Sequence, residues 1–308
     1  MNQEAKLIKF LFFKPYLRQT VWGGTNLKSI YSTNLENIGE AWLISAYPNC
    51  SSICLNPEFF NCSLEQIYQQ HQYLFANYQQ PYPNLIKLID TVDDLSIQIH
   101  PNDQYAQKHY QSYGKNEFWY VLANNGNPFL IDYCENDCQT VLNKLKNHDF
   151  TNLFAYVNLI KDQSIYIPAG TIHAIPAKTM VFEIQQSSDL TFRIYDYDRT
   201  YNQQKRQLHL KEAIDCLIPK QKRIIYQPND TKLINNQYFC LEKIIASKEY
   251  QKIKFQNFAW LEIVVISGQG YIDQYPIKTG DALIMTNLFE NSFDLKGDAV
   301  ILVNTVRQ

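Results

Sequence analysis

The chain has 308 residues, of which 45% are apolar and 19% charged, so it can bury the core of one large or two packed domains. Its net charge of −2 and pI near 6.3 give no electrostatic footprint for binding nucleic acid. No window approaches the roughly 20 apolar residues of a membrane span, and the first residues lack the apolar core of a signal peptide. These properties favour a soluble, cytoplasmic protein that acts on neither nucleic acid nor membrane.

Short strand-like runs dominate the chain and fall into two series. Runs this short with turn signals between them favour a mainly β fold of barrels or sandwiches. The first series comprises 41–46, 95–100, 117–123, 129–133, 164–167, 180–185 and 191–195; the second comprises 238–246, 260–267, 270–273, 282–285 and 299–304. A rough echo between 165–170 and 277–282 suggests that the two series form two related barrels.

A few segments have helical patterns instead, and all of them precede the second strand series. Ser63, followed by Gln66 three residues later, predicts a capping box for a helix over 63–78. Further helices are predicted over 103–111, 137–157 (as one helix or two short ones) and 208–217. The polar stretch 219–230 is typical of a connection, so we expect a catalytic domain over 1–222 with helical insertions and a C-terminal β domain over 223–308.

Seven cysteines, an odd number in a long chain, favour free thiols over a disulfide framework. Cys50/Cys54 and Cys134/Cys138 have the same C-x₃-C spacing, but no matching Cys/His pairs accompany them to complete a structural zinc site. The C-terminal domain contains no histidine, so it cannot repeat a histidine-based metal site. We expect it to support or cover the first domain.

The segment Leu-Ser-Ile-Gln-Ile-His-Pro at 95–101 is the most informative in the chain. Strand side chains alternate between faces, so Ser96, Gln98 and His100 share one face. Buried polar groups cost roughly 1–3 kcal/mol each unless they find partners. A metal ion with a polar substrate would satisfy all three, although an ordinary solvent-facing strand is an alternative for this segment taken alone.

Two later segments add donors of the same chemical kind. Glu117 enters a strongly strand-forming run, and the turn Pro-Ala-Gly-Thr-Ile-His delivers His173. Together with Gln98 and His100 they supply two imidazoles, a carboxylate and an amide oxygen, which suit a divalent first-row metal. Separate strands of a barrel can direct such donors to one interior point. The set predicts a metal site.

This order of motifs resembles the cupin superfamily, with Gln98 where most cupins have their first histidine. Gln-x-His in that place is similar to the type I mannose-6-phosphate isomerases (phosphomannose isomerases), and the likeness to their short bacterial form extends over most of the chain. The matching segments are 14–17, 21–24, 39–45, 87–90, 96–101, 115–117, 166–173 and 188–199. The resemblance implies two cupin-like jelly-roll barrels and an aldose–ketose isomerase that interconverts mannose 6-phosphate and fructose 6-phosphate through an enediol.

The resemblance also implies roles for individual residues. One Zn²⁺ per chain would be held by Gln98, His100, Glu117 and His173. Arg193 would be the basic catalytic residue and Glu183 an acidic one, while Ser96, Lys115 and Arg199 would bind the sugar phosphate. The catalytic base can be Glu183 or a metal-bound water, and the sequence does not choose between them. It also leaves monomer and homodimer open.

Strand alternation gives independent but weaker support for the two charged catalytic residues. It places Glu183 opposite Phe182 and Ile184, and Arg193 on the polar side of its own strand. The alternative is a purely structural Glu183–Arg193 ion pair, or exposure on an outer face.

One departure and two alternative functions accompany this interpretation. Tyr47 begins the segment Tyr-Pro-Asn-Cys where short bacterial members usually have His-Pro-Asn-Gly, so rate or substrate preference can differ.

Two histidines and a carboxylate also describe the triad of Fe(II) oxygenases, but Gln98 as a further ligand would close the position that oxygen needs. A non-catalytic sugar-binding protein with two cupin domains would be expected to lose ligands or Arg193, and this chain has lost none of them.

Overall fold

The computed structural model describes residues 7–135, 137–201 and 203–307. The chain folds into two compact units. Unit 1 comprises residues up to Leu17, Ala41–Lys87 and residues from Asn229 onward, and unit 2 comprises Arg18–Glu40 and Leu88–Pro228. The last boundary falls inside the predicted connection over 219–230. The division into functional domains at residues 222 and 223 stays a prediction, because unit 1 also takes in two earlier segments.

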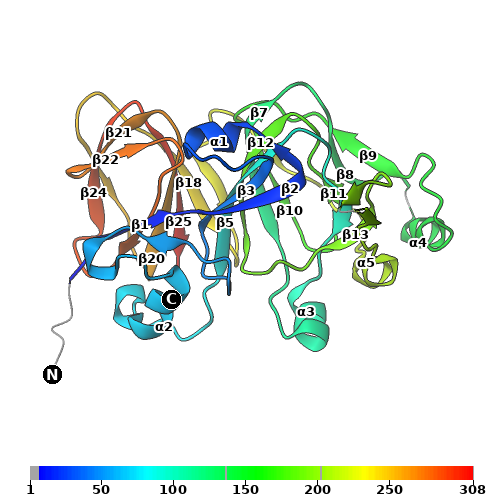
Figure 1. Cartoon of the computed structure of the whole chain (residues 1–308), viewed down its shortest axis with the longest axis horizontal. Helices are drawn as coiled ribbons and strands as arrows, with labels where there is room; N and C mark the ends of the chain where they lie inside the picture. Colours follow the sequence, from blue (N-terminus) through cyan, green and yellow to red (C-terminus); the bar gives the residue numbers. More distant parts are fainter. Residues whose placement is uncertain (1–6, 136, 202, 308) are drawn as a thin grey trace. The chain divides into compact units, whose positions relative to one another are not determined.

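Unit 2 contains the first strand series from residue 95 onward and most of the helices (Figure 1), while 41–46 belongs to unit 1. One antiparallel sheet has the order β16-β10-β7-β12-β5-β2-β3, and a second has the order β13-β6-β11-β8-β9. The first sheet contains β2 (Tyr16–Gly24), β3 (Ile38–Ile44), β5 (Asn84–Thr91), β7 (Glu117–Asn124), β10 (Ser164–Ile167), β12 (Thr179–Gln186) and β16 (Ile225–Tyr226). The second contains β6 (Ile97–Ile99), β8 (Phe129–Tyr133), β9 (Phe154–Val157), β11 (His173–Ala174) and β13 (Phe192–Tyr195). The chain passes between the units within β2, β3 and β5.

The remaining elements of unit 2 are short. The helices are α1 (Asn26–Ile30), α3 (Asp103–Tyr110), α4 (Cys138–Lys146) and α5 (Leu210–Cys216), and a small hairpin joins β14 (Thr200–Tyr201) to β15 (Gln204–Lys205). Two buried apolar clusters support the sheets. One includes Trp119, Ile131 and Ile165, and the other includes Ile97, Ile99 and Ile172. The strands that carry the predicted ligands therefore have apolar neighbours that fix their position.

Unit 1 is built around the order β17-β18-β25-β20-β23-β1-β4, with a smaller antiparallel sheet β19-β24-β21-β22. Its core cluster includes Leu261, Ile263, Leu283 and Val303. The larger sheet contains β1 (Phe10–Lys14), β4 (Ile53–Cys54), β17 (Lys232–Asn235), β18 (Cys240–Ile245), β20 (Trp260–Ser267), β23 (Ala282–Thr286) and β25 (Val300–Val306). The smaller sheet contains β19 (Gln251–Lys254), β21 (Gln269–Ile272), β22 (Tyr275–Lys278) and β24 (Ser292–Gly297). Helical segments here are α2 (Leu64–Gln70) and the 3₁₀ turns η1 (Pro57–Phe59) and η2 (Gln72–Phe75).

The mainly β prediction is confirmed, although the sheets of the described residues stay open rather than closing into barrels. The capping box is confirmed: Ser63 Oγ accepts from Gln66 N at 3.1 Å, and Gln66 Oε1 accepts from Ser63 N at 2.9 Å. That helix ends at Gln70 rather than continuing to residue 78, and a 3₁₀ turn follows it.

The helix prediction over 137–157 is wrong in its second half. Phe154–Val157 forms β9, the edge strand beside β8. The helical spacing of Leu153 and Val157 misled the prediction, because the aromatic and β-branched residues Phe154, Tyr156 and Val157 favour a strand. The helices over 103–110 and 210–216 lie within their predicted ranges.

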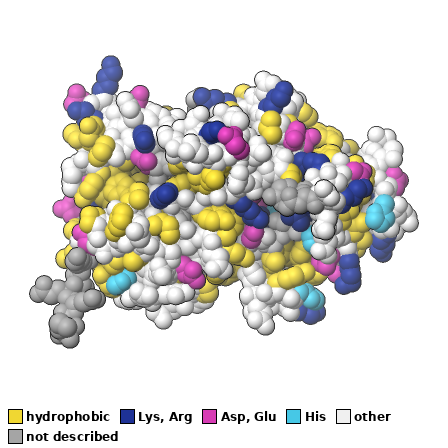
Figure 2. Space-filling model, in the orientation of Figure 1, with side chains coloured by type: hydrophobic (Ala, Val, Ile, Leu, Met, Phe, Trp, Pro, Cys, Tyr) yellow, Lys and Arg dark blue, Asp and Glu magenta, His cyan; other side chains and the backbone are white. Residues whose placement is uncertain are grey.

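None of the helices in the described ranges combines the length and apolar character that a membrane crossing needs. On the face shown in Figure 2, Lys and Arg side chains are interspersed with Asp and Glu over the described residues rather than gathered in one broad patch.

Candidate metal centre

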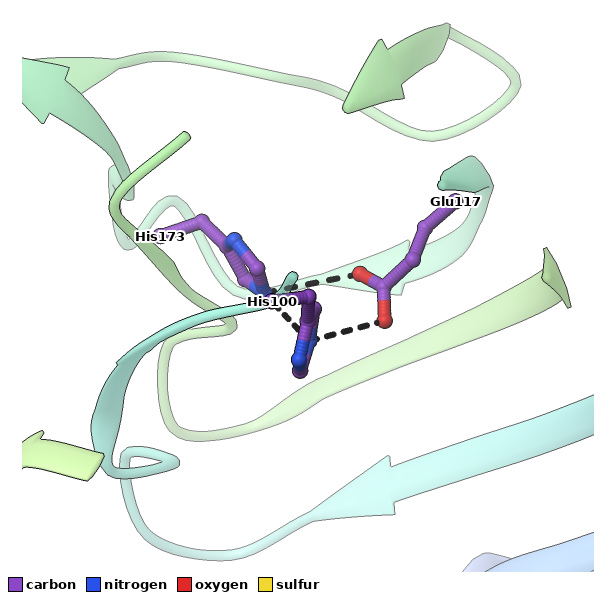
Figure 3. A group of neighbouring side chains, drawn as sticks. All are labelled: His100, Glu117 and His173. Atoms are coloured by element: carbon purple, nitrogen blue, oxygen red, sulfur yellow. Dashed lines mark hydrogen bonds and ion pairs between the residues drawn. The ribbon is translucent and has the colours of Figure 1, made fainter. Parts of the chain in front are cut away.

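Three of the predicted ligands meet in unit 2, as Figure 3 shows. The ligand atoms of His100, Glu117 and His173 all lie within 4.8 Å of one another, and each side chain is about 1% exposed. His100 Nε2 is 3.0 Å from Glu117 Oε1, His173 Nε2 is 3.4 Å from Glu117 Oε2, and the two Nε2 atoms are 3.1 Å apart. Residues separated by up to 73 positions thus converge on one point.

Backbone carbonyls orient both imidazoles. His100 Nδ1 donates to Leu190 O at 2.8 Å, and His173 Nδ1 donates to Thr171 O at 2.9 Å. A proton on each Nδ1 leaves the lone pair on each Nε2, and those are the nitrogens that face Glu117. Hydrogen bonds of this kind fix the tautomer of metal-binding histidines in known sites.

The charge states of the three groups suit a cation. Burial, reinforced by the charge of Lys115, lowers the pKa of His100 to about 3, and burial also lowers the pKa of His173. Burial alone would raise the pKa of Glu117, but Lys115 and the two histidines outweigh it and hold that pKa well below its usual value. The centre therefore contains two neutral imidazoles and one carboxylate at neutral pH, the form in which all three bind metal.

The hydrogen-bond pattern tests whether a cation fits this centre. Lys115 Nζ lies 3.0 Å from Glu117 Oε1, yet neither oxygen of this buried carboxylate receives a hydrogen bond of proper geometry. Gln185 Oε1, on the residue directly across the ladder from Glu117, is also buried without one. The Nε2 atoms of His100 and His173 and the Glu117 carboxylate lie at contact distance, and all of them are acceptors. They repel one another unless a cation or a proton donor lies between them. The residues present fit a divalent metal ion.

Gln98, the fourth predicted ligand, borders the same point. It lies between His173 and Arg193 in the strand register of β11, β6 and β13, and its Nε2 is 3.4 Å from His173 Nε2. A half-turn of the amide exchanges Nε2 and Oε1 without moving the rest of the side chain, so Gln98 can present its oxygen to a cation there. Ser96 Oγ is 3.5 Å from Gln98 Oε1, on the face that strand alternation predicted.

The predicted catalytic residues lie on strands beside this centre. Glu183 is 3% exposed, and its Oε1 accepts from Trp119 Nε1 at 2.9 Å; the Trp119 ring in turn contacts the His173 ring edge-on at 5.4 Å. Arg193 stands across the ladder from Gln98. Its backbone N–H donates to His209 Nδ1 at 3.3 Å, a partner that the sequence did not reveal. The catalytic roles of Glu183 and Arg193 stay predictions, now with both residues placed on strands next to those of the ligands.

Arg199 lies at a different point. Its guanidinium donates to the Asp196 carboxylate at 2.6 Å, to Asp196 O at 3.2 Å and to Asp94 O at 2.6 Å. These contacts hold the side chain in the loop after β13, and none of them joins the metal set. Its role in binding the sugar phosphate stays a prediction.

Arg206, a second arginine in this region, was not singled out from the sequence. Arg206 Nε donates to Asp196 Oδ2 at 2.7 Å, and its Nη2 contacts the other oxygen. Burial lowers the pKa of Arg193, and the nearby charge of Arg206 is the next largest cause. Two guanidiniums on the one carboxylate of Asp196 leave a net positive charge close to Arg193. Arg206 lies outside the motif that ended at Arg199, which is why the pattern gave no signal for it.

The comparisons with known proteins bear on this geometry. The family model described as the catalytic domain of type I phosphomannose isomerase matches residues 11–130. The mannose-6-phosphate isomerase of Streptococcus mutans is 32% identical over 311 residues, covering 96% of this chain and 97% of that protein.

The chain belongs to the type I phosphomannose isomerase family.

Further relatives agree with this membership. Mannose-6-phosphate isomerase from Bacillus subtilis is 32% identical over 96% of this chain and 98% of its own. A crystal structure of the mannose 6-phosphate isomerase from Bacillus subtilis matches with a TM-score of 0.88 at 26% identity, covering 97% of this chain and all of that one. A putative mannosephosphate isomerase from Archaeoglobus fulgidus shares the fold, with a TM-score of 0.80 at 17% identity over 99% of this chain. Phosphomannose isomerase structures have the cupin fold, as the sequence predicted.

The departure at Tyr47 is structurally accommodated in unit 1. Its ring packs edge-on against Trp42 at 5.8 Å, and Lys87 Nζ lies 4.8 Å from the centre of the same indole. Whether this residue alters rate or substrate preference stays a prediction.

Proposed function

We propose that this chain is a mannose-6-phosphate isomerase that interconverts mannose 6-phosphate and fructose 6-phosphate with one Zn²⁺ held by Gln98, His100, Glu117 and His173. The proposal rests on one observation: in a chain of this family, the ligand atoms of His100, Glu117 and His173 converge, and all of them are hydrogen-bond acceptors. Imidazole nitrogens and a carboxylate oxygen are donors that zinc takes in proteins. The comparisons favour neither an oxygenase nor a non-catalytic sugar-binding protein.

The reaction moves a proton between C1 and C2 of the open-chain sugar through an enediol. A divalent ion in this centre supplies Lewis-acid polarisation of the neighbouring sugar oxygens. Arg193 supplies a fixed positive charge for the oxygen that becomes negative as the carbon loses its proton. The alignment of Arg193 with Gln98 across the ladder supports this role.

Glu183 is the protein carboxylate that we propose to carry the proton. Trp119 Nε1 holds its Oε1 at 2.9 Å, which fixes the plane of the carboxylate on the side of the sheet that carries the centre. A positioned carboxylate contributes to proton transfer when it lies within hydrogen-bond reach of the carbon acid.

The substrate's phosphate requires cations and donors. Lys115 and Ser96 border the metal set, at 3.0 Å from Glu117 and 3.5 Å from Gln98 respectively. Arg199 and Arg206 add the net positive charge around Asp196. Arginines suit phosphate because their planar guanidinium matches two of its oxygens. We therefore propose that the sugar end of the substrate lies at Ser96 and Lys115 and that the arginine group attracts the phosphate.

The seven cysteines bear on where the enzyme works. All of them are free thiols in the structure, which agrees with the cytoplasmic location that the composition favours.

A coupled assay tests the function directly. The purified protein is expected to convert mannose 6-phosphate to fructose 6-phosphate, to lose this activity when a chelator removes its metal, and to regain it with zinc. Circular dichroism of the metal-free protein controls for unfolding. Isomerisation that persists at full rate after the metal has been removed, as verified by elemental analysis, would refute the metal-dependent proposal, and no turnover in any metal form would refute the isomerase itself.

A further inference from the structure

Asn116 lies between two groups of the candidate centre but faces away from it. Lys115 and Glu117 project to one side of the chain, where Lys115 Nζ meets Glu117 Oε1, so alternation directs the Asn116 side chain to the other. Asn116 is 5% exposed, and its side chain forms hydrogen bonds with Gln186, Tyr166 and Ala169. Asn116 is therefore not expected to contact the substrate. Its hydrogen bonds join several segments of the chain.

The Asn116 side-chain amide forms hydrogen bonds with residues from two other segments. Its Nδ2 and its backbone N–H both donate to Gln186 Oε1, at 2.7 and 3.0 Å. Its Oδ1 accepts from Tyr166 O–H at 2.7 Å and from Ala169 N at 3.0 Å. Tyr166 and Ala169 belong to the strand and turn that deliver His173. One side chain thus links the start of the Glu117 strand to the His173 turn.

Gln186 extends the link to the segment after His100. Its Nε2 donates to Asp103 Oδ1 at 2.8 Å, and the same oxygen accepts from Gly114 N at 2.9 Å. Backbone bonds run in parallel, from Lys115 N to Pro101 O at 2.9 Å and from Gly170 N to His100 O at 2.8 Å. A Cβ on Gly114 would come within 2.5 Å of Asp103 N, so the two segments approach as closely as glycine permits.

We infer that Asn116 and Gln186 are positioning residues of the metal centre, which hold the segments bearing His100, Glu117 and His173 in register. The inference rests on the proposed function, because it presupposes that these three residues bind a metal ion. A metal site needs its donors held to within fractions of an ångström, and rigid support of the ligand-bearing segments supplies this. Loss of the amide link lets the three segments move independently, so affinity for the metal falls while the donor atoms remain.

The test measures the affinity of the full-length protein for Co²⁺. A competing chelator sets the concentration of free Co²⁺. Asn116→Ala is expected to bind Co²⁺ about 10- to 100-fold more weakly than wild type, the range found for residues that support ligands. The visible absorption of bound Co²⁺ should also change in intensity, because it reports ligand geometry.

Asn304→Ala is the matched control. Asn304 is another buried amide, 1% exposed, that accepts from Cys240 N at 3.0 Å and donates to Glu262 at 2.9 Å in unit 1. Removing this buried, hydrogen-bonded amide should lower the stability of the protein, while the Co²⁺ affinity and the spectrum of bound Co²⁺ stay those of wild type. Equal weakening of Co²⁺ binding in both variants would overturn the inference, since the effect would then be a general loss of stability.

Tyr166→Phe keeps the inference testable should Asn116→Ala fail to fold. It removes one hydrogen bond to Asn116 Oδ1 and leaves the Ala169 bond in place, so we expect a weakening of Co²⁺ binding by a factor of about two to ten. Wild-type affinity in every folded variant of the network would overturn the inference and leave the proposed function intact. A wild-type protein that binds no divalent metal would overturn both.

Discussion

Glu117 in unit 2 and Glu262 in unit 1 are the same residue type in opposite circumstances. Each is about 1% exposed on a sheet strand. Glu262 accepts from Tyr82 O–H at 2.6 Å, from Asn84 at 3.0 Å, from Asn304 at 2.9 Å and from Trp260 at 3.4 Å. Glu117 receives no hydrogen bond of proper geometry and faces two imidazole lone pairs.

The difference separates a structural carboxylate from a ligand. Burial raises the pKa of Glu262 despite its four neutral donors, whereas the cation and imidazoles around Glu117 hold its pKa low. A carboxylate whose partners are all present needs nothing further, whereas Glu117 has Lys115 on one side and two imidazole lone pairs on the other, and can accept a metal ion there. Burial of an acidic residue is therefore a poor guide to function until its partners are counted.

The ligands of unit 2 should give the largest effect. His173→Ala removes one donor of the centre, and we expect loss of the metal together with a fall in kcat of roughly a thousandfold, since several kcal/mol of charge stabilisation go with it. Elemental analysis and the isomerase assay measure the two losses. Stoichiometric metal with near-normal turnover would show that His173 is not a ligand.

Arg193→Ala separates catalysis from metal binding. The variant should retain its metal and lose turnover by about 10²–10³-fold, as removal of one preorganised charge does in other enzymes. His209→Ala is a useful comparison, because the bond from the Arg193 backbone N–H to His209 does not involve the guanidinium. We expect a much smaller loss there, and an Arg193→Ala enzyme with wild-type kcat would exclude the proposed role.

Tyr82→Phe probes the other glutamate. It takes one donor from buried Glu262 and should lower the free energy of unfolding by about 1–3 kcal/mol, with kcat unchanged. Tyr68→Phe serves as the control, because its hydroxyl donates to the neutral carbonyl of Gln80 at 2.6 Å, so its loss should cost less. Denaturant titration gives both values. A fall in kcat of Tyr82→Phe at temperatures where it is folded would contradict the structural assignment of Glu262.

The smallest effect is a pH dependence of stability. Because the pKa of Glu262 is raised in the folded state, the folded chain holds this proton at pH values where the unfolded chain has released it. The contribution of this proton to the free energy of unfolding is present below pH 4.5, the ordinary pKa, and is lost as the pH rises through the pKa of the folded state. Glu262→Gln has no proton to lose, so its stability should fall less over that window, and parallel pH profiles for the two proteins would be contrary to this account.

Local pattern was enough to predict much of the metal centre. Alternation placed Ser96, Gln98 and His100 on one face, and the Pro-Ala-Gly turn marked the arrival of His173. These signals survive in a single sequence because each depends on residues within a few positions of one another. The strand over 84–91 was not predicted, since Lys87 and Asp90 interrupt its apolar run; yet all eight residues are buried.

What the sequence could not predict depends on partners far apart in the chain. Apart from Trp260, the donors to Glu262 come from positions 42 to 180 residues away, so the residues around Glu262 in the sequence do not indicate that it is satisfied. Asp90 likewise looks like a candidate acid but accepts from Asn26 N at 2.7 Å at the start of α1. Arg206 reaches Asp196 through a hairpin, and the Asn116 amide link needs four segments at once.

Metal content of paired glutamate variants tests the central claim most directly. Glu117→Gln and Glu262→Gln make the same chemical change at equally buried positions, and each purified protein can be analysed for bound zinc after dialysis against a fixed free concentration. The account predicts one zinc per chain in wild type and Glu262→Gln, and a large loss in Glu117→Gln. Full zinc occupancy in Glu117→Gln, or an equal loss in both variants, would contradict it.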